Sequence, residues 1–238
     1  MRSIERYGDH PSQHAELFLP DEGPAEATAV VIHGGFWRDR YDRHLMDGLC
    51  ADLAASGWAA WNLEYRRVGD DGGGWPATCD DIKCGIDALA AVAGGLPLDR
   101  IVTIGHSAGG HLALWAAATV DGVTGVVSLA GVSDLVDAYR RGLSSDATGS
   151  FMGGTPDEVP ERYAAASPMA LLPIGVPALL VHGDHDENVP VELSVSFADA
   201  ARAAGDEVEL VIRPGVDHFE VIDPRGESWR IVMDWLGD

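Results

Sequence analysis

The chain has 238 residues, of which 46 % are apolar and 23 % charged, and its 38 acidic against 16 basic residues give a formal charge of −22. This length suits one compact domain, and the composition excludes a disordered or fibrous chain. The negative charge repels phosphate backbones and anionic membrane surfaces, so neither nucleic acid nor a membrane is expected as a partner.

Several short β-rich runs alternate with longer segments of helical periodicity, and this order predicts an α/β fold, a mostly parallel sheet of about seven or eight strands with helices on both faces. The predicted strands are residues 15–20, 28–33, 58–63, 100–105, 125–130, 177–183 and 208–213. Helical patterns occupy residues 41–56, 76–93, 111–120, 190–205 and 228–236. Pro190 is expected at the first helical position of its helix and Gly205 at the left-handed cap that ends it.

One stretch interrupts this alternation, because residues 132–175 are rich in Ser, Gly, Asp and Pro. Its length of about forty residues exceeds an ordinary connection. We predict that it forms a small lid inserted into a single domain of residues 1–238.

No apolar run reaches the about 18 residues that span a bilayer, and the first residues lack the apolar stretch of a signal peptide. We therefore expect a cytoplasmic protein, with monomer and homodimer both left open. The three cysteines, Cys50, Cys79 and Cys84, are an odd number without CxxC spacing and are expected to be reduced core residues.

A Gly-x-Ser-x-Gly sequence, Gly105-His106-Ser107-Ala108-Gly109, lies directly after a predicted strand and directly before an apolar helix. Small residues beside Ser107 allow the chain to turn sharply and to approach its neighbours closely. We predict that Ser107 is a nucleophile displayed at the edge of the sheet. A glycine-rich turn without chemistry is the alternative, because such matches also occur by chance.

The segment His33-Gly34-Gly35-Phe36-Trp37 follows another predicted strand, at the place where an α/β sheet of this kind supplies a second oxyanion-binding amide. We expect the amides of Gly35 or Phe36, together with that of Ala108, to face the negative charge that develops on a carbonyl oxygen. A plain turn at the end of a strand remains the alternative.

Two later loops provide an acid and a base. Asp186 follows the strand at 177–183, and we select it over Asp184 and Glu187, which spacing alone does not exclude. His218 follows the last strand, which gives the chain order Ser, Asp, His. Its neutral imidazole is expected to take the Ser107 proton, while Asp186 fixes the tautomer.

Three aromatic residues, Trp37, Trp75 and Phe219, adjoin the predicted loops and are expected to line an aromatic-accepting substrate pocket, with core packing as the alternative. The chain has no HExxH pair, no cysteine cluster and no GKS or GKT ending to its glycine-rich tract. We therefore expect neither a metal nor a cofactor.

Together, HGGFW, GHSAGGHLA, HGDHDENVP and DHFEVIDP resemble the motif set of the α/β-hydrolase superfamily, specifically its esterase and kynurenine formamidase branch. The resemblance covers most of the chain, but residues 132–175 depart from it and do not align with a lid of these families. It implies that Ser107, Asp186 and His218 fall on the catalytic triad positions, with Gly35, Phe36 and Ala108 on the oxyanion loops.

A serine hydrolase is therefore expected, forming an acyl-enzyme on a small or aromatic carboxylic ester or on an N-formyl aryl amide, with a small molecule as its partner. Feruloyl and acetyl-xylan esterases share nearly all of these motifs, so the resemblance does not select the substrate. A non-catalytic ligand-binding protein on the same scaffold is the other alternative. The presence of all three triad residues argues against it.

Overall fold

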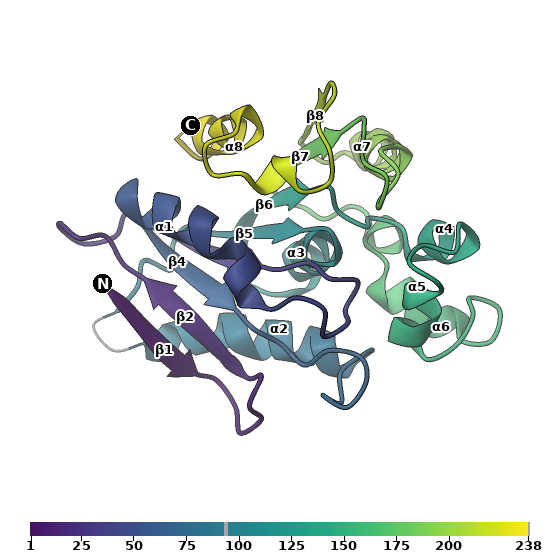
Figure 1. The fold of residues 1–238 in the computed structure, drawn as a ribbon, viewed down its shortest axis with the longest axis horizontal. Coiled ribbons are helices and arrows are strands. Elements are labelled where there is room, and N and C mark those ends of the chain that lie inside the picture. The colour runs from purple at the N-terminus through teal and green to yellow at the C-terminus, as the bar shows by residue number, and fades with distance from the viewer. Residues whose placement is uncertain (93–94, 238) are drawn as a thin grey trace.

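The computed structural model describes residues 1–92 and 95–237, and an eight-stranded sheet runs through the whole molecule (Figure 1). The strand order is β1-β2-β4-β3-β5-β6-β7-β8, in which β1, β2 and β4 pair antiparallel and the remaining pairs are parallel. The strands are β1 (Arg2–Arg6), β2 (His14–Phe18), β3 (Ala27–Ile32), β4 (Trp58–Leu63), β5 (Ile101–His106), β6 (Val123–Leu129), β7 (Ala178–Gly183) and β8 (Val208–Arg213). The predicted fold class is confirmed.

Among the strands, β1 is the one that the sequence pattern did not predict. Its residues, RSIER, are mostly exposed and pair only with β2 at the edge of the sheet. An edge strand with charged side chains carries no buried stripe, so hydrophobic alternation could not reveal it.

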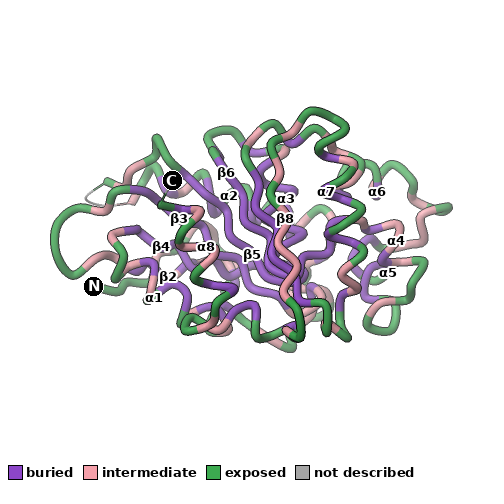
Figure 2. The backbone as a smooth tube through the Cα atoms, turned by 90° about the horizontal axis from the view of Figure 1, so that it is seen from above, coloured by how far each residue is buried: buried purple, intermediate pink, exposed green. Residues whose placement is uncertain are grey.

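The central strands are buried on both faces, and Figure 2 shows them as a purple band between exposed loops. In β3, Ala29 and Val31 pack on the side of α1 and α8, whereas Val30 and Ile32 pack on the side of α2 and α3. Such strands read as continuous apolar runs, which is why the sequence located them well.

Helices cover both faces of the sheet. They are α1 (Asp47–Ala55), α2 (Ala77–Asp87), α3 (Ala108–Thr119), α4 (Leu135–Arg140), α5 (Ala147–Met152), α6 (Pro160–Ala166), α7 (Glu192–Ala204) and α8 (Glu227–Gly237), with 3-10 turns at Arg43–Met46, Ala88–Ala91, Pro168–Leu171 and Glu220–Ile222.

The predicted helix ends are mostly reproduced. Gly205 caps α7 in the left-handed region at φ 101°, as expected. Pro190 does not begin that helix, because α7 starts two residues later at Glu192. The predicted end of the helix at residue 93 lies outside the described residues.

The segment 132–175 is compact and partly helical, since α4, α5, α6 and a 3-10 turn occupy much of it. These short helices gather at one end of the molecule beyond α3 (Figure 1). Several of their side chains, among them Leu135, Phe151 and Tyr163, belong to the same core as α2 and α3. The expected role as a lid stays a prediction.

The cysteine expectation is correct for two of the three residues. Cys50 and Cys79 are buried, but Cys84 is exposed on α2. The prediction for Cys84 is wrong because α2 is amphipathic and this residue lies on its solvent side. The helices in the described part of the chain are all too short or too polar to cross a lipid bilayer.

Candidate active site

Ser107 occupies a strained turn between β5 and α3, with φ 56° and ψ −120°. Its amide donates to the Leu129 carbonyl at 2.9 Å. The flanking glycines make this turn feasible, because a Cβ on Gly105 would lie 1.9 Å from the Gly109 carbonyl oxygen, and one on Gly109 would lie 2.1 Å from that of Ile32. The sequence folds in this way because these positions lack side chains.

Asp186 and His218 form a close pair. The distance from Asp186 Oδ2 to His218 Nδ1 is 2.6 Å, and Asp186 Oδ1 accepts the Asn188 and Val189 amides, both at 2.8 Å. Burial opposes ionisation of Asp186, but hydrogen bonds from His182 and His218 hold its pKa well below the usual range. The carboxylate is therefore ionised and fixes the orientation of the His218 ring.

The two alternative acids are placed differently. Asp184 accepts the Gly215 amide at 2.6 Å and so supports the loop that leads to His218. Glu187 is exposed at the mouth of the cavity described below. The geometry thus singles out Asp186 as the acid that pairs with His218.

His218 and Ser107 line one cavity of about 310 Å³. His106, directly before the serine, donates from Nε2 to the His218 carbonyl at 2.8 Å, and the two rings are 4.6 Å apart. Burial, and then repulsion from His218 whenever that ring is protonated, lower the pKa of His106 to about 3. His106 therefore stays neutral and ties the histidine loop to the serine turn.

The loop after β3 lies against the same turn. Gly34 is so close that a Cβ there would be 2.8 Å from the His106 carbonyl oxygen and 2.9 Å from Ser107 Cβ. Gly35 and Phe36 have φ of 121° and 51°, and both line the cavity. Within the described residues their amides donate to no protein group, so they are free to bind an oxyanion.

Ala108 is the first residue of α3. An amide at the first position of a helix has no acceptor in the preceding turn, and it adds to the positive end of the helix dipole. Of the three amides proposed for the oxyanion hole, one thus lies at the start of α3 and two lie in the loop after β3, which contacts the serine turn.

Phe219 is the predicted substrate-binding aromatic residue that does line the cavity, with 41 % of its surface exposed. Trp37 does not line it, because its fully buried ring stacks on Phe151 at 4.6 Å and its Nε1 donates to His111. This indole is a core residue.

Trp75 also lies away from the cavity. It is half-buried and packs edge-on against Trp115, with 6.4 Å between ring centroids. For both tryptophans, closeness to a predicted loop in sequence did not fix the direction of the side chain. Packing a large aromatic surface in the core determined it instead.

The sequence reasoning missed several residues that line the cavity. They are Arg38, Arg40, Tyr41, Leu45, His106, Ser144 and Asn188. Ser144 belongs to segment 132–175, so this segment contributes to the wall of the cavity. Arg38 donates to the carbonyls of Ser144 and Ser145 at 2.9 and 3.2 Å, and so joins the two walls.

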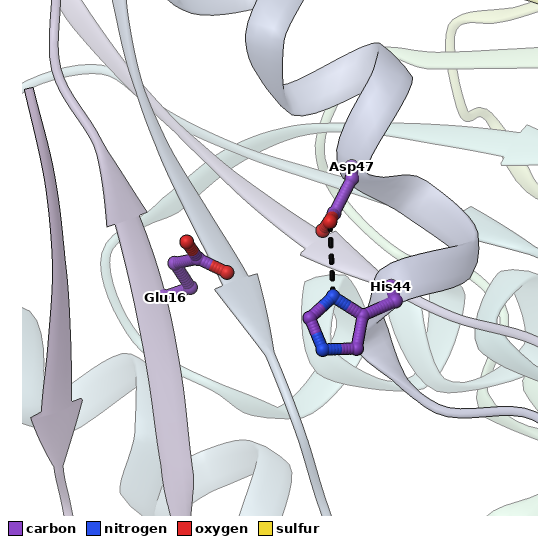
Figure 3. A group of neighbouring side chains, drawn as sticks. All are labelled: Glu16, His44 and Asp47. Atoms are coloured by element: carbon purple, nitrogen blue, oxygen red, sulfur yellow. Dashed lines mark hydrogen bonds and ion pairs between the residues drawn. The ribbon is translucent and has the colours of Figure 1, made fainter.

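A possible metal-binding group lies apart from this cavity. Glu16, His44 and Asp47 place one potential ligand atom each within 4.8 Å of the others (Figure 3). The guanidinium of Arg43 already pairs with both carboxylates, and Asn62 donates to Asp47. These contacts already engage both carboxylates, so we interpret the cluster as a structural charge network.

The sheet order, the strained serine between β5 and α3, and the Asp186–His218 pair define an α/β-hydrolase. A family model, BD-FAE, matches residues 15–200, and the chain belongs to this family.

Named relatives include esterase LipC of Mycobacterium tuberculosis, 28 % identical over 91 % of this chain, which spans only 59 % of LipC. Kynurenine formamidase avaC of Aspergillus versicolor is 28 % identical, with 84 % of this chain and 83 % of avaC covered. Among solved structures, a truncated carbohydrate esterase from gut microbiota has a TM-score of 0.87 at 21 % identity, covering 99 % of this chain and 94 % of its own.

Proposed function

We propose that the protein is a serine hydrolase that cleaves a small or aromatic carboxylic ester, or an N-formyl aryl amide, through an acyl-enzyme on Ser107. The observation that carries the proposal is the 2.6 Å contact between Asp186 and His218 beside the cavity that His218 shares with Ser107. No cofactor enters the proposed chemistry.

The reaction follows from the groups around this cavity. Ser107 Oγ attacks the carbonyl carbon as His218 Nε2 takes the hydroxyl proton, and Asp186 stabilises the imidazolium that forms. The oxyanion is bound by the amides of Ala108 and of Gly35 or Phe36. His218 then protonates the leaving group. Water attacks the acyl-enzyme as His218 takes its proton, and that proton returns to Ser107 Oγ as the acid is released.

The size and lining of the cavity support the substrate class. A volume of about 310 Å³ is at the small end for ligand pockets. Phe36, Tyr41 and Phe219 present aromatic surfaces, which suit a short acyl chain or one aromatic ring. The relatives named as esterase, formamidase and carbohydrate esterase support acyl transfer and differ in substrate.

Labelling with a fluorophosphonate probe tests the chemistry. We expect the wild-type protein to be labelled at Ser107 and Ser107→Ala to stay unlabelled. Its kcat should fall about 10⁴- to 10⁶-fold while its urea unfolding midpoint hardly changes, because the nucleophile and base act as a unit. Near-normal turnover by this variant, or an unlabelled wild type, would instead favour a non-catalytic binding protein.

The substrate is tested by a panel. Turnover of N-formylkynurenine, p-nitrophenyl acetate, methyl ferulate and acetylated xylan should be compared at equal enzyme concentration. A formamidase should show the highest kcat/KM on N-formylkynurenine, and a broad carboxylesterase on p-nitrophenyl acetate. The cytoplasmic location and the choice between monomer and homodimer stay predictions from the sequence.

A further inference from the structure

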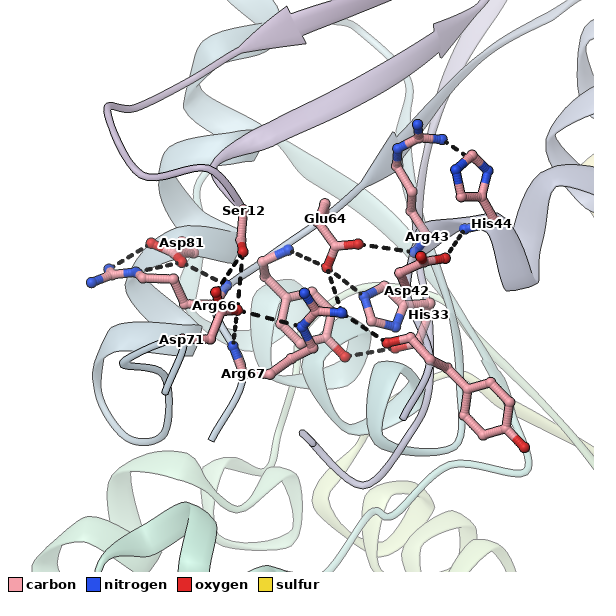
Figure 4. Close-up of polar contacts among 12 residues, drawn as sticks. Ser12, His33, Asp42, Arg43, His44, Glu64, Arg66, Arg67, Asp71 and Asp81 are labelled. Carbon is pink, nitrogen blue, oxygen red and sulfur yellow. Dashed lines mark hydrogen bonds and ion pairs between the residues drawn. The ribbon is translucent and has the colours of Figure 1, made fainter. Parts of the chain in front are cut away.

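The fully buried ring of His33, at the end of β3, has an oxygen acceptor at each nitrogen. Nδ1 is 2.8 Å from the Gly34 carbonyl oxygen. Nε2 is 3.0 Å from Glu64 Oε1, and Figure 4 shows this contact. A neutral imidazole carries one N–H and can donate to only one of these oxygens. When the Glu64 carboxyl is ionised, both contacts are hydrogen bonds only if both ring nitrogens carry protons.

His111 illustrates how a neutral buried histidine is satisfied. Its Nδ1 accepts from Trp37 Nε1 at 3.2 Å, and its Nε2 donates to the Ala166 carbonyl at 2.9 Å. One donor and one acceptor match the two nitrogens of a neutral ring. His33 instead has an acceptor at each nitrogen, so its contacts do not match a neutral ring in the way that those of His111 do.

Glu64 is placed to be ionised. Its carboxylate accepts the amides of Arg43 and Tyr65, each at 3.0 Å, and lies 3.7 Å from Arg67 Nη1. Burial opposes ionisation, but the hydrogen bond and charge of His33, followed by the charge of Arg67, lower the pKa of Glu64 to about 2. Two backbone N–H donors and the nearby Arg67 guanidinium stabilise the ionised form of the Glu64 carboxylate, so the proton shared by this pair is placed on His33.

The remaining surroundings of the His33 ring are compatible with a cation. The Tyr65 ring stacks on it at 4.4 Å with an interplanar angle of 12°, and the Tyr65 hydroxyl donates to the His33 carbonyl. Aromatic faces attract cations. From β5, His106 approaches the adjacent Gly34 and is neutral, as described above.

The hydrogen bond from Nδ1 has a consequence at the cavity. The Gly34–Gly35 peptide is trans, so its N–H points away from its C=O. By holding the Gly34 carbonyl, His33 fixes the direction of the Gly35 amide, which is one of the amides proposed to bind the oxyanion.

We propose that His33 is a buried imidazolium, ion-paired with Glu64, and that it acts as a positioning residue for the oxyanion loop. The protonation state rests on the hydrogen bonds and charges around His33 and Glu64. The catalytic consequence rests on the proposed function.

The protonation state is tested by NMR of the protein labelled with ¹⁵N-histidine, at about pH 8, well above the ordinary histidine pKa of about 6.5. We expect one ring with protons on both nitrogens, unchanged in His218→Ala and lost in Glu64→Gln. Asp81→Asn is the matched control, because this buried carboxylate of the same region pairs with Arg66 and not with His33. A wild-type spectrum without such a ring, or its persistence in Glu64→Gln, would overturn the assignment.

Kinetics test the positioning role. We expect Glu64→Gln to lower kcat by about 10- to 100-fold, less than the 10²- to 10³-fold typical of a lost oxyanion donor, with KM within about twofold of wild type. Asp81→Asn should keep its kcat. Unchanged kcat in Glu64→Gln would refute the positioning role. A wild-type protein without hydrolase activity would refute the proposed function, and the NMR result would still decide the charge on His33.

Discussion

Two carboxylates near the cavity, Glu64 and Asp186, are almost fully removed from water, with 5 % and 0 % of their side chains exposed. Each remains ionised because nearby N–H groups supply the hydrogen bonds that water would otherwise provide. Both follow buried strands, β4 and β7, so the ends of parallel strands bring them to the same edge of the sheet. Asp186 orients His218, and Glu64 supports the oxyanion loop through its contact with His33.

Glu64 should affect stability in acid. Its pKa lies at about 2 in the folded chain, against 4.5 for an ordinary glutamate. A depressed pKa contributes stability above about pH 4.5, and this is lost as the pH falls towards 2. We expect the wild type to lose up to about 3 kcal/mol more than Glu64→Gln between these pH values, measured by urea unfolding. Parallel curves for the two proteins would contradict the ionised pair.

The sequence indicated some site residues well and others poorly. Ser107, Asp186 and His218 lie in short motifs at strand ends, and the structure places His218 in contact with Asp186 and in one cavity with Ser107. Glu64 also directly follows a buried strand, and a charged residue at that place was the available indication of its role. Trp37 shows the limit of prediction from the sequence, since no local pattern tells whether an aromatic ring points to a cavity or to the core.

At the scale of elements, the unit that determines the site is β5, the serine turn and α3, pressed against the end of β3. Gly109 lies so close to the carbonyls of Ile32 and His33 that no side chain fits there. The serine turn and the oxyanion loop are therefore positioned by direct backbone contact. A small displacement of the serine turn therefore also displaces the oxyanion loop, because packed backbones have little freedom to relax.

Gly105→Ala tests this contact. A methyl group there would lie 1.9 Å from the Gly109 carbonyl oxygen, so we expect a loss of about 3 kcal/mol or more in the free energy of unfolding. Gly122→Ala is the control, because Gly122 also lies in a turn, at φ 88°, but has open space around its Cα. We expect Gly122→Ala to lose only about 1–2 kcal/mol of the free energy of unfolding, because alanine is strained in the left-handed conformation. Equal urea midpoints for the two variants would count against the packing argument.

Elements were predictable where burial imposes a pattern. The strands β2 to β8 and the long helices follow from apolar runs and helical periodicity. The exposed β1 and the three short helices within residues 132–175 do not, because their packing depends on partners far away in the chain. The alternation of strands and helices was enough for the fold class, whereas the walls of the cavity required the tertiary structure.

For the molecule as a whole, the charge of −22 opposes the approach of anionic substrates. The cavity is a local exception, because Arg38 and Arg40 line it and neither forms an ion pair within the described residues. Arg40 is exposed, 5.5 Å from the centre of the Tyr41 ring. Its positive charge faces whatever part of the substrate extends from the cavity on that side.

Arg40→Gln should therefore change selectivity by charge. We expect kcat/KM for an aryl ester with a free carboxylate to fall about 3- to 10-fold relative to a neutral ester of equal length, since one charge pair near a surface is worth about 1 kcal/mol. The effect should vanish in about 1 M salt, where the Debye length is about 3 Å. Arg6→Gln, on exposed β1 and with the same loss of charge, serves as control. A similar fall in that variant would assign the effect to net charge rather than to position.

The exposure of Cys84 on α2 has a practical consequence. Cys50 and Cys79 are fully buried, and burial raises the pKa of both thiols, so neither reacts readily. Cys84 does not line the cavity beside Ser107. A maleimide dye, spin label or solid support can thus be attached at one defined position on the native chain, leaving the serine free for measurement.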